Sequence, residues 1–331
     1  MSESAPHKWS APTSLRPIHS TLSIPGSKSA TNRAFVLAAL GDGISRITKP
    51  LLARDTELML AALQKLGCEV TRESDAILIS PMKKAHQDIE IDVGLAGTVM
   101  RFVPPLTALS VGVAHFDGDK RARNRPMKTL IDALKKLKIS VDDQSTGSLP
   151  FSITSDGIVQ GGEVLIDASE SSQFISALLL VAAKFKNGLT IKHNGGNLPS
   201  LPHIEMTIEM LKQVGVIVDS TMKNTWVVKP GAIKSRDWLI EPDLSNAGPF
   251  LAAALVTKGE VTILDWPAET TQAGKAWREI LSQMGAEVSL TTTGLTIKHS
   301  GEIKGININL ANFGELTPIL VAIALFANSK T

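Results

Sequence analysis

The chain has 331 residues, of which 43% are hydrophobic and 20% charged, proportions typical of a globular protein with room for two compact domains. Lysine plus arginine number 34 against 32 acidic residues, so a net charge of +2 gives no reason to expect nucleic acid or an anionic membrane as the main partner. The single cysteine excludes an intrachain disulfide, and the seven histidines show no metal-ligand spacing.

The first residues, MSESAPHKWSAPTSLRP, lack the apolar core of a signal peptide. The longest apolar stretches, FISALLLVAA and ILVAIALFA, have about half of the roughly 20 residues that a membrane span needs. We therefore expect a soluble cytoplasmic protein. Cys68, in LQKLGCEV, is expected to be a buried structural thiol.

Residues 23–40, SIPGSKSATNRAFVLAAL, place Gly-Ser-Lys-Ser ahead of an apolar helical run. A P-loop needs glycine directly before the lysine and another five residues earlier, whereas this chain has Ser27 and Leu22 there. The segment is therefore not a P-loop. It does gather Lys28, two serines and Arg33 around a helix start, where free N–H groups and the helix dipole favour an anion.

A short polar turn followed by a helix of small apolar residues recurs five times along the chain. Equivalent points in the five copies are Lys28, Gly97, Ser172, Asn246 and Glu315. They lie roughly 70 residues apart, which indicates an internal repeat. Because apolar residues surround almost the whole of each helix, we expect these inner helices to be buried on all sides.

A second, amphipathic helix alternates with the first kind, with equivalent points at Leu66, Leu137, Val214 and Met284. Its apolar residues follow the i, i+3, i+4 pattern of a helix half open to water. Strand signals between the helices are AILIS, EVLID, TWVVK and EVTIL. The repeat is therefore mixed α and β. A Rossmann pair is excluded by the repeat length and by the lack of a Gly-x-Gly-x-x-Gly motif.

The polar turns before the inner helices differ from copy to copy. If they only capped the helices, Ser, Thr, Asp or Asn would be enough at each helix start. Capping stays an equal alternative at ESSQ and DLSN. Lys28 and Arg33 favour function, because an ion at the end of a buried helix needs a partner such as a bound anion. Arg125 is singled out because Pro126 fixes the chain direction before a helix. Glu315 suits a helix start structurally, but its equivalence to Lys28 favours catalysis.

Six motifs in one order now stand out: PGSKSATNRA, GLAGTVMR, RNRP, SESSQF, SLPHIEMT and GELTP. From about Ser23 to the last residue the chain resembles the 5-enolpyruvylshikimate-3-phosphate synthase (EPSP synthase) family. The resemblance implies an α/β fold of two lobes, an inverse α/β barrel built from repeated β-α-β-α-β-β units. Three units, residues 23–235, would form the first lobe. Residues 1–22 and 236–331 would form an incomplete second lobe, because the fifth copy stops at Thr331 just after its inner helix.

The resemblance implies that the substrates are shikimate 3-phosphate and phosphoenolpyruvate. It implies a monomer that needs no metal, organic cofactor, nucleic acid or membrane. The implied catalytic residues are Lys28 and Glu315. The implied ligands of shikimate 3-phosphate are Lys28, Ser29, Arg33, Ser171, Ser172, Gln173, Ser200, His203 and Glu315. The implied ligands of phosphoenolpyruvate are Lys28, Gly97, Arg125 and Gln173.

In the implied reaction the 5-hydroxyl of shikimate 3-phosphate adds to C2 of phosphoenolpyruvate as C3 is protonated, and phosphate then leaves. Glu315 would accept the hydroxyl proton, while Lys28 would exchange protons and steady the developing charge. Arg125 would hold phosphoenolpyruvate by a two-pronged contact that lysine could not copy.

The chain also departs from the family pattern. Leu95 stands where many members have Asn, and Phe102 where many have Pro, so inhibitor sensitivity does not transfer. His203 replaces the usual Tyr over the shikimate ring, and its charge can vary near neutral pH. The family's Lys-Glu-Thr/Ser-Asp-Arg run and the Arg and Lys after it are absent, so we expect these 331 residues alone to bind shikimate 3-phosphate but to turn over slowly.

Two alternatives stay open. The sister transferase that acts on UDP-N-acetylglucosamine shares the fold, but it uses a Lys-Asn pair near its start and usually a loop Cys. The Lys28–Ser29 pair and the position of Cys68 argue against it. The second alternative is a non-catalytic fragment that binds phosphate esters.

Overall fold

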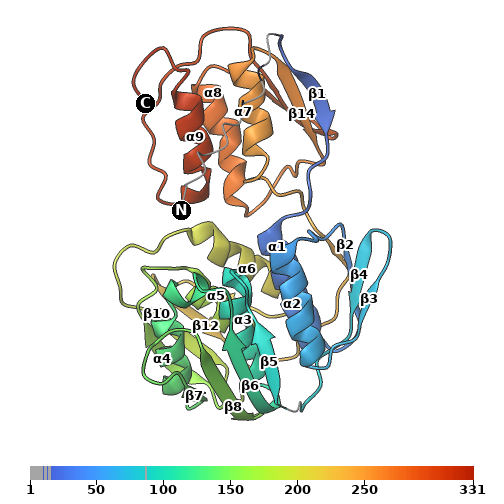
Figure 1. Cartoon of the computed structure of the whole chain (residues 1–331), viewed down its shortest axis with the longest axis vertical. Coiled ribbons are helices and arrows are strands. Elements are labelled where there is room, and N and C mark those ends of the chain that lie inside the picture. The colour runs from blue at the N-terminus through green and yellow to red at the C-terminus, as the bar shows by residue number, and fades with distance from the viewer. Residues whose placement is uncertain (1–9, 11–12, 14–15, 86–87) are drawn as a thin grey trace, which may run out of the picture.

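The computed structural model describes residues 10, 13, 16–85 and 88–331. Two hydrophobic cores divide this part of the chain, one between Ala34 and Ile240 and the other between Leu244 and Ile323. We call the halves around them the first lobe and the second lobe (Figure 1). The strand β1 (His19–Leu22) packs with the second core, so the chain passes from the second lobe to the first and back again.

The sheets are built on one plan. The strands after β1 are β2 (Ser45–Thr48), β3 (Val70–Arg72), β4 (Ala76–Ile79), β5 (Ile89–Asp92), β6 (Val111–Asp117), β7 (Ser140–Asp142), β8 (Phe151–Asp156), β9 (Gly162–Ile166), β10 (Leu189–His193), β11 (Val218–Asp219), β12 (Thr225–Val228), β13 (Trp238–Leu239), β14 (Glu260–Leu264), β15 (Glu287–Leu290) and β16 (Gly294–Lys298). Within the described ranges they form four sheets, ordered β13-β2-β4-β3, β5-β6-β8-β7, β9-β10-β12-β11 and β1-β14-β16-β15. The first two strands of each order are parallel and the other neighbours antiparallel. The strands predicted from AILIS, EVLID, TWVVK and EVTIL are confirmed as β4, β9, β12 and β14.

The inner helices begin at the predicted points or within two residues of them. They are α1 (Lys28–Leu40), α3 (Gly97–Thr107), α5 (Gln173–Ala182), α7 (Gly248–Val256) and α9 (Thr317–Ala324). Almost every residue of α1, α3 and α5 is buried, as predicted. The same prediction is wrong for α7 and α9, which are open on one side. The reason is their surroundings: α1, α3 and α5 pack against one another, whereas α7 has only α9 as an inner-helix neighbour in the described chain.

The outer helices end at the equivalent points found in the sequence. They are α2 (Arg54–Lys65), α4 (Lys128–Lys136), α6 (Leu201–Gln213) and α8 (Trp277–Gln283), and they are capped by Leu66, Leu137, Val214 and Met284. The residue after each cap has a positive φ angle: Gly67, Lys138, Gly215 and Gly285. A left-handed residue at this position turns the chain out of the helix, so the repeated Gly marks where the helix stops. Short 3-10 turns are η1 (Ala122–Asn124), η2 (Ala273–Ala276) and η3 (Gly314–Leu316).

Two adjacent segments carry the chain between the lobes. The backbone N–H of Ser27 donates to the carbonyl of Glu241 at 2.8 Å, and that of Asp243 donates to Pro25 at 2.9 Å. A Cβ atom at Gly26 would lie 2.3 Å from the carbonyl oxygen of Lys49, so only glycine fits there.

The segment before the second crossing still belongs to the first lobe. The strand β13 pairs with β2 in a first-lobe sheet, and Ile240 is part of the first core. The division into two domains at 1–22, 23–235 and 236–331 stays a prediction.

Other expectations concern single features. Cys68 is buried, as predicted, and burial raises the pKa of its thiol to about 12. None of the helices in the described part of the chain has both the length and the apolar character needed to cross a membrane. The prediction that the first residues lack a signal-peptide core falls mostly on residues outside the described ranges.

Candidate functional site

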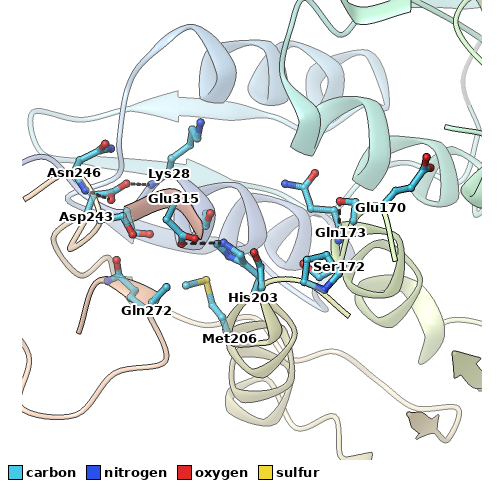
Figure 2. A pocket seen from close by; sticks show the side chains of 17 residues that line it. Lys28, Glu170, Ser172, Gln173, His203, Met206, Asp243, Asn246, Gln272 and Glu315 are labelled. Atoms are coloured by element: carbon cyan, nitrogen blue, oxygen red, sulfur yellow. Dashed lines mark hydrogen bonds and ion pairs between the residues drawn. The ribbon is translucent and has the colours of Figure 1, made fainter. Parts of the chain in front are cut away.

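A cavity of about 420 Å³ opens where the polar ends of the inner helices meet (Figure 2). The first lobe contributes Ser27, Lys28, Ser29, Glu170, Ser171, Ser172, Gln173, Pro199, Ser200, His203 and Met206. The second lobe contributes Asp243, Ser245, Asn246, Gln272, Ala273 and Glu315. Eight of the predicted site residues therefore share one cavity, while Arg33, Gly97 and Arg125 do not line it.

Lys28 stands at the start of α1, on the rim of this cavity. Its backbone N–H donates to Asp243 Oδ2 at 3.2 Å, which ties α1 to the second lobe. Its ammonium lies 3.4 Å from Asp55 Oδ2, and its side chain is 48% exposed. In Figure 2 the side chain extends away from His203 and Glu315. A ligand anion would have to compete with Asp55 for this charge.

The start of α5 answers one question that the sequence left open. Ser171 Oγ accepts the backbone N–H of Gln173 at 3.3 Å, which is a capping contact. Ser172 occupies the N-cap position but makes no such contact through its side chain. The hydroxyl of Ser172 and the side-chain amide of Gln173 are therefore not consumed by capping the helix.

The carboxylate of Asp243 orders the turn DLSN ahead of α7, although the N-cap residue Ala247 makes no side-chain capping contact. This carboxylate accepts the N–H of Asn246 at 3.0 Å through Oδ1, in addition to the N–H of Lys28 through Oδ2. Because this one carboxylate accepts an N–H group from each lobe, Asp243 connects the two lobes at the edge of the cavity.

Arg33 is buried behind the cavity wall. Its Nε donates to Thr207 Oγ1 at 2.7 Å, and its two terminal nitrogens donate to the carbonyls of Ser29 at 2.9 Å and His203 at 3.0 Å. Burial lowers its pKa to about 9, so it remains a cation at neutral pH. The guanidinium thus links α1 to α6 through neutral acceptors. Its contact with a ligand stays a prediction.

His203 and Glu315 face each other across the cavity, 3.5 Å apart between Nε2 and Oε1 (Figure 2). Their side chains are 25% and 30% exposed. Burial by itself raises the pKa of Glu315, but hydrogen bonds from His203 and from its own backbone N–H outweigh this effect and lower the pKa overall. Glu315 is therefore an ionised carboxylate at neutral pH and can accept a proton from a ligand.

Gly97 and Arg125 lie next to each other. A Cβ atom at residue 97 would lie 2.7 Å from Arg125 Nη2, so the glycine makes room for the guanidinium. Arg125 Nη1 donates to the carbonyl of Leu95 at 2.7 Å, a backbone contact that the Leu side chain does not change. Phe102 is buried under the Arg33 guanidinium, which lies 5.2 Å from the ring centre.

Three residues of this region received no role from the sequence. Gln272 binds the crossing segment by donating to Glu241 Oε2 at 2.8 Å and to the carbonyl of Pro242 at 2.9 Å. No local pattern marks Gln272 or Met206. Arg101 had a signal, since it is a charge inside an otherwise apolar inner helix. Among the described residues, no three His, Cys, Asp and Glu side chains gather into a group that could hold a metal ion.

Comparisons with known proteins agree with these motifs. The family model described as EPSP synthase (3-phosphoshikimate 1-carboxyvinyltransferase) matches residues 12–331. The 3-phosphoshikimate 1-carboxyvinyltransferase of Mycobacterium ulcerans (strain Agy99) is 47% identical over 324 residues, which cover 97% of this chain and 74% of that protein. The enzyme of the same name from Kocuria rhizophila (strain ATCC 9341 / DSM 348 / NBRC 103217 / DC2201) is 46% identical over 334 residues, covering 98% of this chain and 75% of that protein.

Solved structures confirm the predicted fold class. EPSP synthase from Acinetobacter baumannii matches with a TM-score of 0.78 at 21% identity, over 94% of this chain and 72% of that one. The enolpyruvyl transferase NikO from Streptomyces tendae matches with a TM-score of 0.71 at 14% identity, over 95% of this chain and 74% of that one. At these identities the two structures support the fold alone.

Proposed function

The chain belongs to the family of EPSP synthases (3-phosphoshikimate 1-carboxyvinyltransferases), and from this premise we propose how its cavity carries out the family's reaction. The enzyme transfers the enolpyruvyl group of phosphoenolpyruvate to the 5-hydroxyl of shikimate 3-phosphate, with release of phosphate, in the shikimate pathway of aromatic amino acid biosynthesis. One observation carries the proposal: Lys28, the serines at the starts of α5 and α6, and Glu315 open onto the same cavity.

The first lobe holds shikimate 3-phosphate in this proposal. Ser171 and Ser172 lie at the start of α5 and Ser200 at the start of α6, where free N–H groups and helix dipoles favour a phosphate. Lys28 and Ser29 take the ring hydroxyls and His203 supplies a flat face. Arg33 reaches the ligand carboxylate by giving up one of its backbone acceptors. A buried cation with only neutral partners gains from such an exchange.

Phosphoenolpyruvate binds beside it, between Gln173 and Arg125. Arg125 has one terminal nitrogen on the carbonyl of Leu95, and its planar group can turn both prongs to a carboxylate or phosphate. Gly97 leaves the space that this guanidinium needs. Lys28 joins the second substrate by leaving Asp55, an exposed pairing that costs little to break.

The proton chemistry falls to Glu315 and Lys28. Glu315 accepts the proton of the 5-hydroxyl while the new C–O bond forms at C2 of phosphoenolpyruvate and C3 takes up a proton. Loss of phosphate from C2 and of one proton from C3 then restores the double bond. Lys28 steadies the charge that develops and exchanges the C3 proton. The low pKa of Glu315 supports its part, because the group starts out ionised.

We also propose that the enzyme works in the cytoplasm as a monomer. The lone, buried Cys68 supports a reducing compartment, and the net charge of +2 supports small-molecule substrates rather than nucleic acid. Light scattering after gel filtration tests the oligomeric state.

A turnover assay tests the reaction. The purified chain is given phosphoenolpyruvate with shikimate 3-phosphate, or with UDP-N-acetylglucosamine as the rival acceptor, and phosphate release is followed. We expect release with the first acceptor only, and the reverse would favour the sister transferase. Calorimetry that detects shikimate 3-phosphate binding without any product would favour the non-catalytic fragment.

A further inference from the structure

Arg101 is a buried cation in the middle of α3 that the proposed reaction does not use. Its exposed fraction is 4%, and its guanidinium lies 5.1 Å from the ring centre of Phe174. Burial and then the nearby charge of Arg125 lower its pKa to about 10, and the carboxylate of Glu170 has a smaller, opposite effect, so Arg101 stays charged at neutral pH. In the described part of the chain no carboxylate forms an ion pair with it. Such a charge is costly to bury unless something compensates it.

The guanidinium donates only to neutral oxygens. Arg101 Nη1 lies 2.8 Å from Gln173 Oε1 and 3.2 Å from Ser171 Oγ, while Nη2 lies 3.4 Å from the carbonyl of Pro126. Ser171 and Gln173 both line the cavity, whereas Arg101 does not. The charge therefore sits directly behind two neutral side chains that face the substrates.

Because of its contact with Arg101, the hydroxyl of Ser171 can act toward a ligand only as a hydrogen-bond donor. A hydroxyl has two acceptor lone pairs and one O–H. Ser171 Oγ accepts from Arg101 Nη1 and also from the backbone N–H of Gln173, at 3.3 Å. Both lone pairs are engaged, and its O–H has no acceptor among the described residues. The free proton is available to a ligand in the cavity.

The hydrogen bond with Arg101 also fixes the orientation of the Gln173 side-chain amide. A guanidinium has donors only, so the amide must turn its oxygen toward Arg101 and its NH₂ group away. Figure 2 shows the nitrogen end of this amide on the side where Lys28 lies. Its two N–H groups have no acceptor among the described residues. Without Arg101 the amide could rotate and offer its oxygen instead.

We propose that Arg101 is a positioning residue that fixes the polarity of Ser171 and Gln173, so that these two side chains offer only hydrogen-bond donors to an anionic substrate. The proposal rests on the proposed function and deepens it, since Ser171 and Gln173 are proposed ligands of shikimate 3-phosphate. Arg101 itself touches no substrate. When an anion binds in front of the two donors, its negative charge compensates the buried charge of Arg101. Anion binding is thereby coupled to a residue in the core of the first lobe.

Calorimetric titration with shikimate 3-phosphate tests the proposal on three variants. Arg101→Met removes the charge and keeps the bulk. Arg101→Lys keeps the charge, but a single ammonium cannot hold both oxygens in the same geometry. Arg236→Met is the matched control, because Arg236 also stacks on an aromatic ring, 5.3 Å from the centre of Trp238, and does not line the cavity.

We expect Arg101→Met to weaken binding about 10- to 100-fold, the range of charge-assisted hydrogen bonds, and Arg101→Lys to weaken it less. The control should bind as the parent does. A parent that fails to bind shikimate 3-phosphate would count against the proposed function. A parent that binds, with Arg101→Met and Arg101→Lys folded and binding equally well, would overturn the role of Arg101.

A double-mutant cycle separates positioning from a merely structural role. In a chain that carries Ser171→Ala and Gln173→Ala, the two side chains through which Arg101 acts are gone. We expect Arg101→Met to have little further effect on binding in that background. An undiminished effect there would show that Arg101 acts by supporting the fold alone. If Arg101→Met does not fold, the same cycle is made with Arg101→Lys.

Discussion

The two lobes carry the same repeat, yet their inner helices have different surroundings. In the first lobe α1, α3 and α5 bury one another almost completely. In the second lobe Phe250, Val321, Leu325 and Phe326, on or next to α7 and α9, are between 45% and 82% exposed. Since α7 and α9 are at least as apolar as α1, α3 and α5, the difference in burial comes from how many neighbours each helix has and not from its own sequence.

The lobes also differ in the charges they bring to the cavity. The first lobe places cations at the wall or behind it, at Lys28, Arg33 and Arg101, together with one carboxylate, Glu170. The charged residues that the second lobe brings are both carboxylates, Asp243 and Glu315. The cations that can hold anions therefore come from the first lobe, and the proposed proton acceptor comes from the second.

The largest expected effect is on the acidic side. Glu315→Gln keeps the shape of the side chain and removes the base, so we expect kcat to fall about 100- to 10,000-fold while shikimate 3-phosphate still binds. Glu287→Gln is the control, because Glu287 is an exposed second-lobe carboxylate paired with Lys298 on β16. If Glu315→Gln kept normal turnover, the second lobe would not supply the proton acceptor.

Matched leucine substitutions test the contrast in burial. Leu179 in α5 is fully buried, whereas Leu325 at the end of α9 is largely exposed. We expect Leu179→Ala to lower the free energy of unfolding by about 2–5 kcal/mol. Leu325→Ala should change it by less than about 0.5 kcal/mol.

Urea unfolding followed by tryptophan fluorescence measures both variants, since Trp226 and Trp238 report on the first core and Trp266 and Trp277 on the second. Equal losses for the two leucines would mean that the α7–α9 face is covered in solution. The contrast between the lobes would then be withdrawn.

Local patterns in the sequence predicted much of this fold. Lys28 and Gly97 begin inner helices, and Leu66 and Met284 cap outer ones. These features depend on a few neighbouring residues, namely a polar turn, an apolar period and a glycine after the helix. The lining of the cavity follows as well, because equivalent turns of a repeat gather at one end of their helices.

Long-range contacts could not be predicted in this way. Arg33 bonds to Thr207, which is 174 positions later, and this contact draws its side chain behind the wall. Arg101 meets Ser171 across 70 positions. No periodicity reports on either contact. The sequence analysis marked Arg33 as unusual without showing what it touches, and it gave Arg101 no role.

The pH dependence of activity tests the contact between the lobes at His203 and Glu315. Because hydrogen bonding lowers the pKa of Glu315, the parent should lose kcat/KM only as the pH falls below the ordinary glutamate range. His203→Phe removes the lowering contact and leaves burial, so the acid limb should move to higher pH. The contact between His203 and Glu315 also stabilises the fold. Its contribution to the free energy of unfolding is present above the pKa that Glu315 has in the unfolded chain, and it is lost as the pH falls through the lowered pKa of the folded state.

His115→Phe on β6 is the control for this profile, since His115 is exposed and lies outside the cavity. If His203→Phe does not shift the pH at which kcat/KM falls on the acid side, the ionisation of Glu315 does not depend on the first lobe.

The smallest effect is expected at the exposed ion pair between the lobes, where Lys49 Nζ lies 2.9 Å from Asp265 Oδ2. Both residues have positive φ angles, so Asp265→Asn is the suitable change, because asparagine tolerates that backbone. We expect a loss of less than about 1 kcal/mol in the free energy of unfolding, and the loss should vanish at high salt.

Asp75→Asn serves as the matched change within one lobe, since Asp75 pairs with Arg46 on the same sheet. Similar small losses for both variants would mean that a surface ion pair counts for little even when it bridges the lobes. Their relative placement then depends on the backbone hydrogen bonds of the crossing segments, from Ser27 to Glu241 and from Asp243 to Pro25. A much larger loss of unfolding free energy for Asp265→Asn would instead mean that the surface ion pair is the main contact holding the lobes together. The alignment of the cavity residues would then depend on this pair.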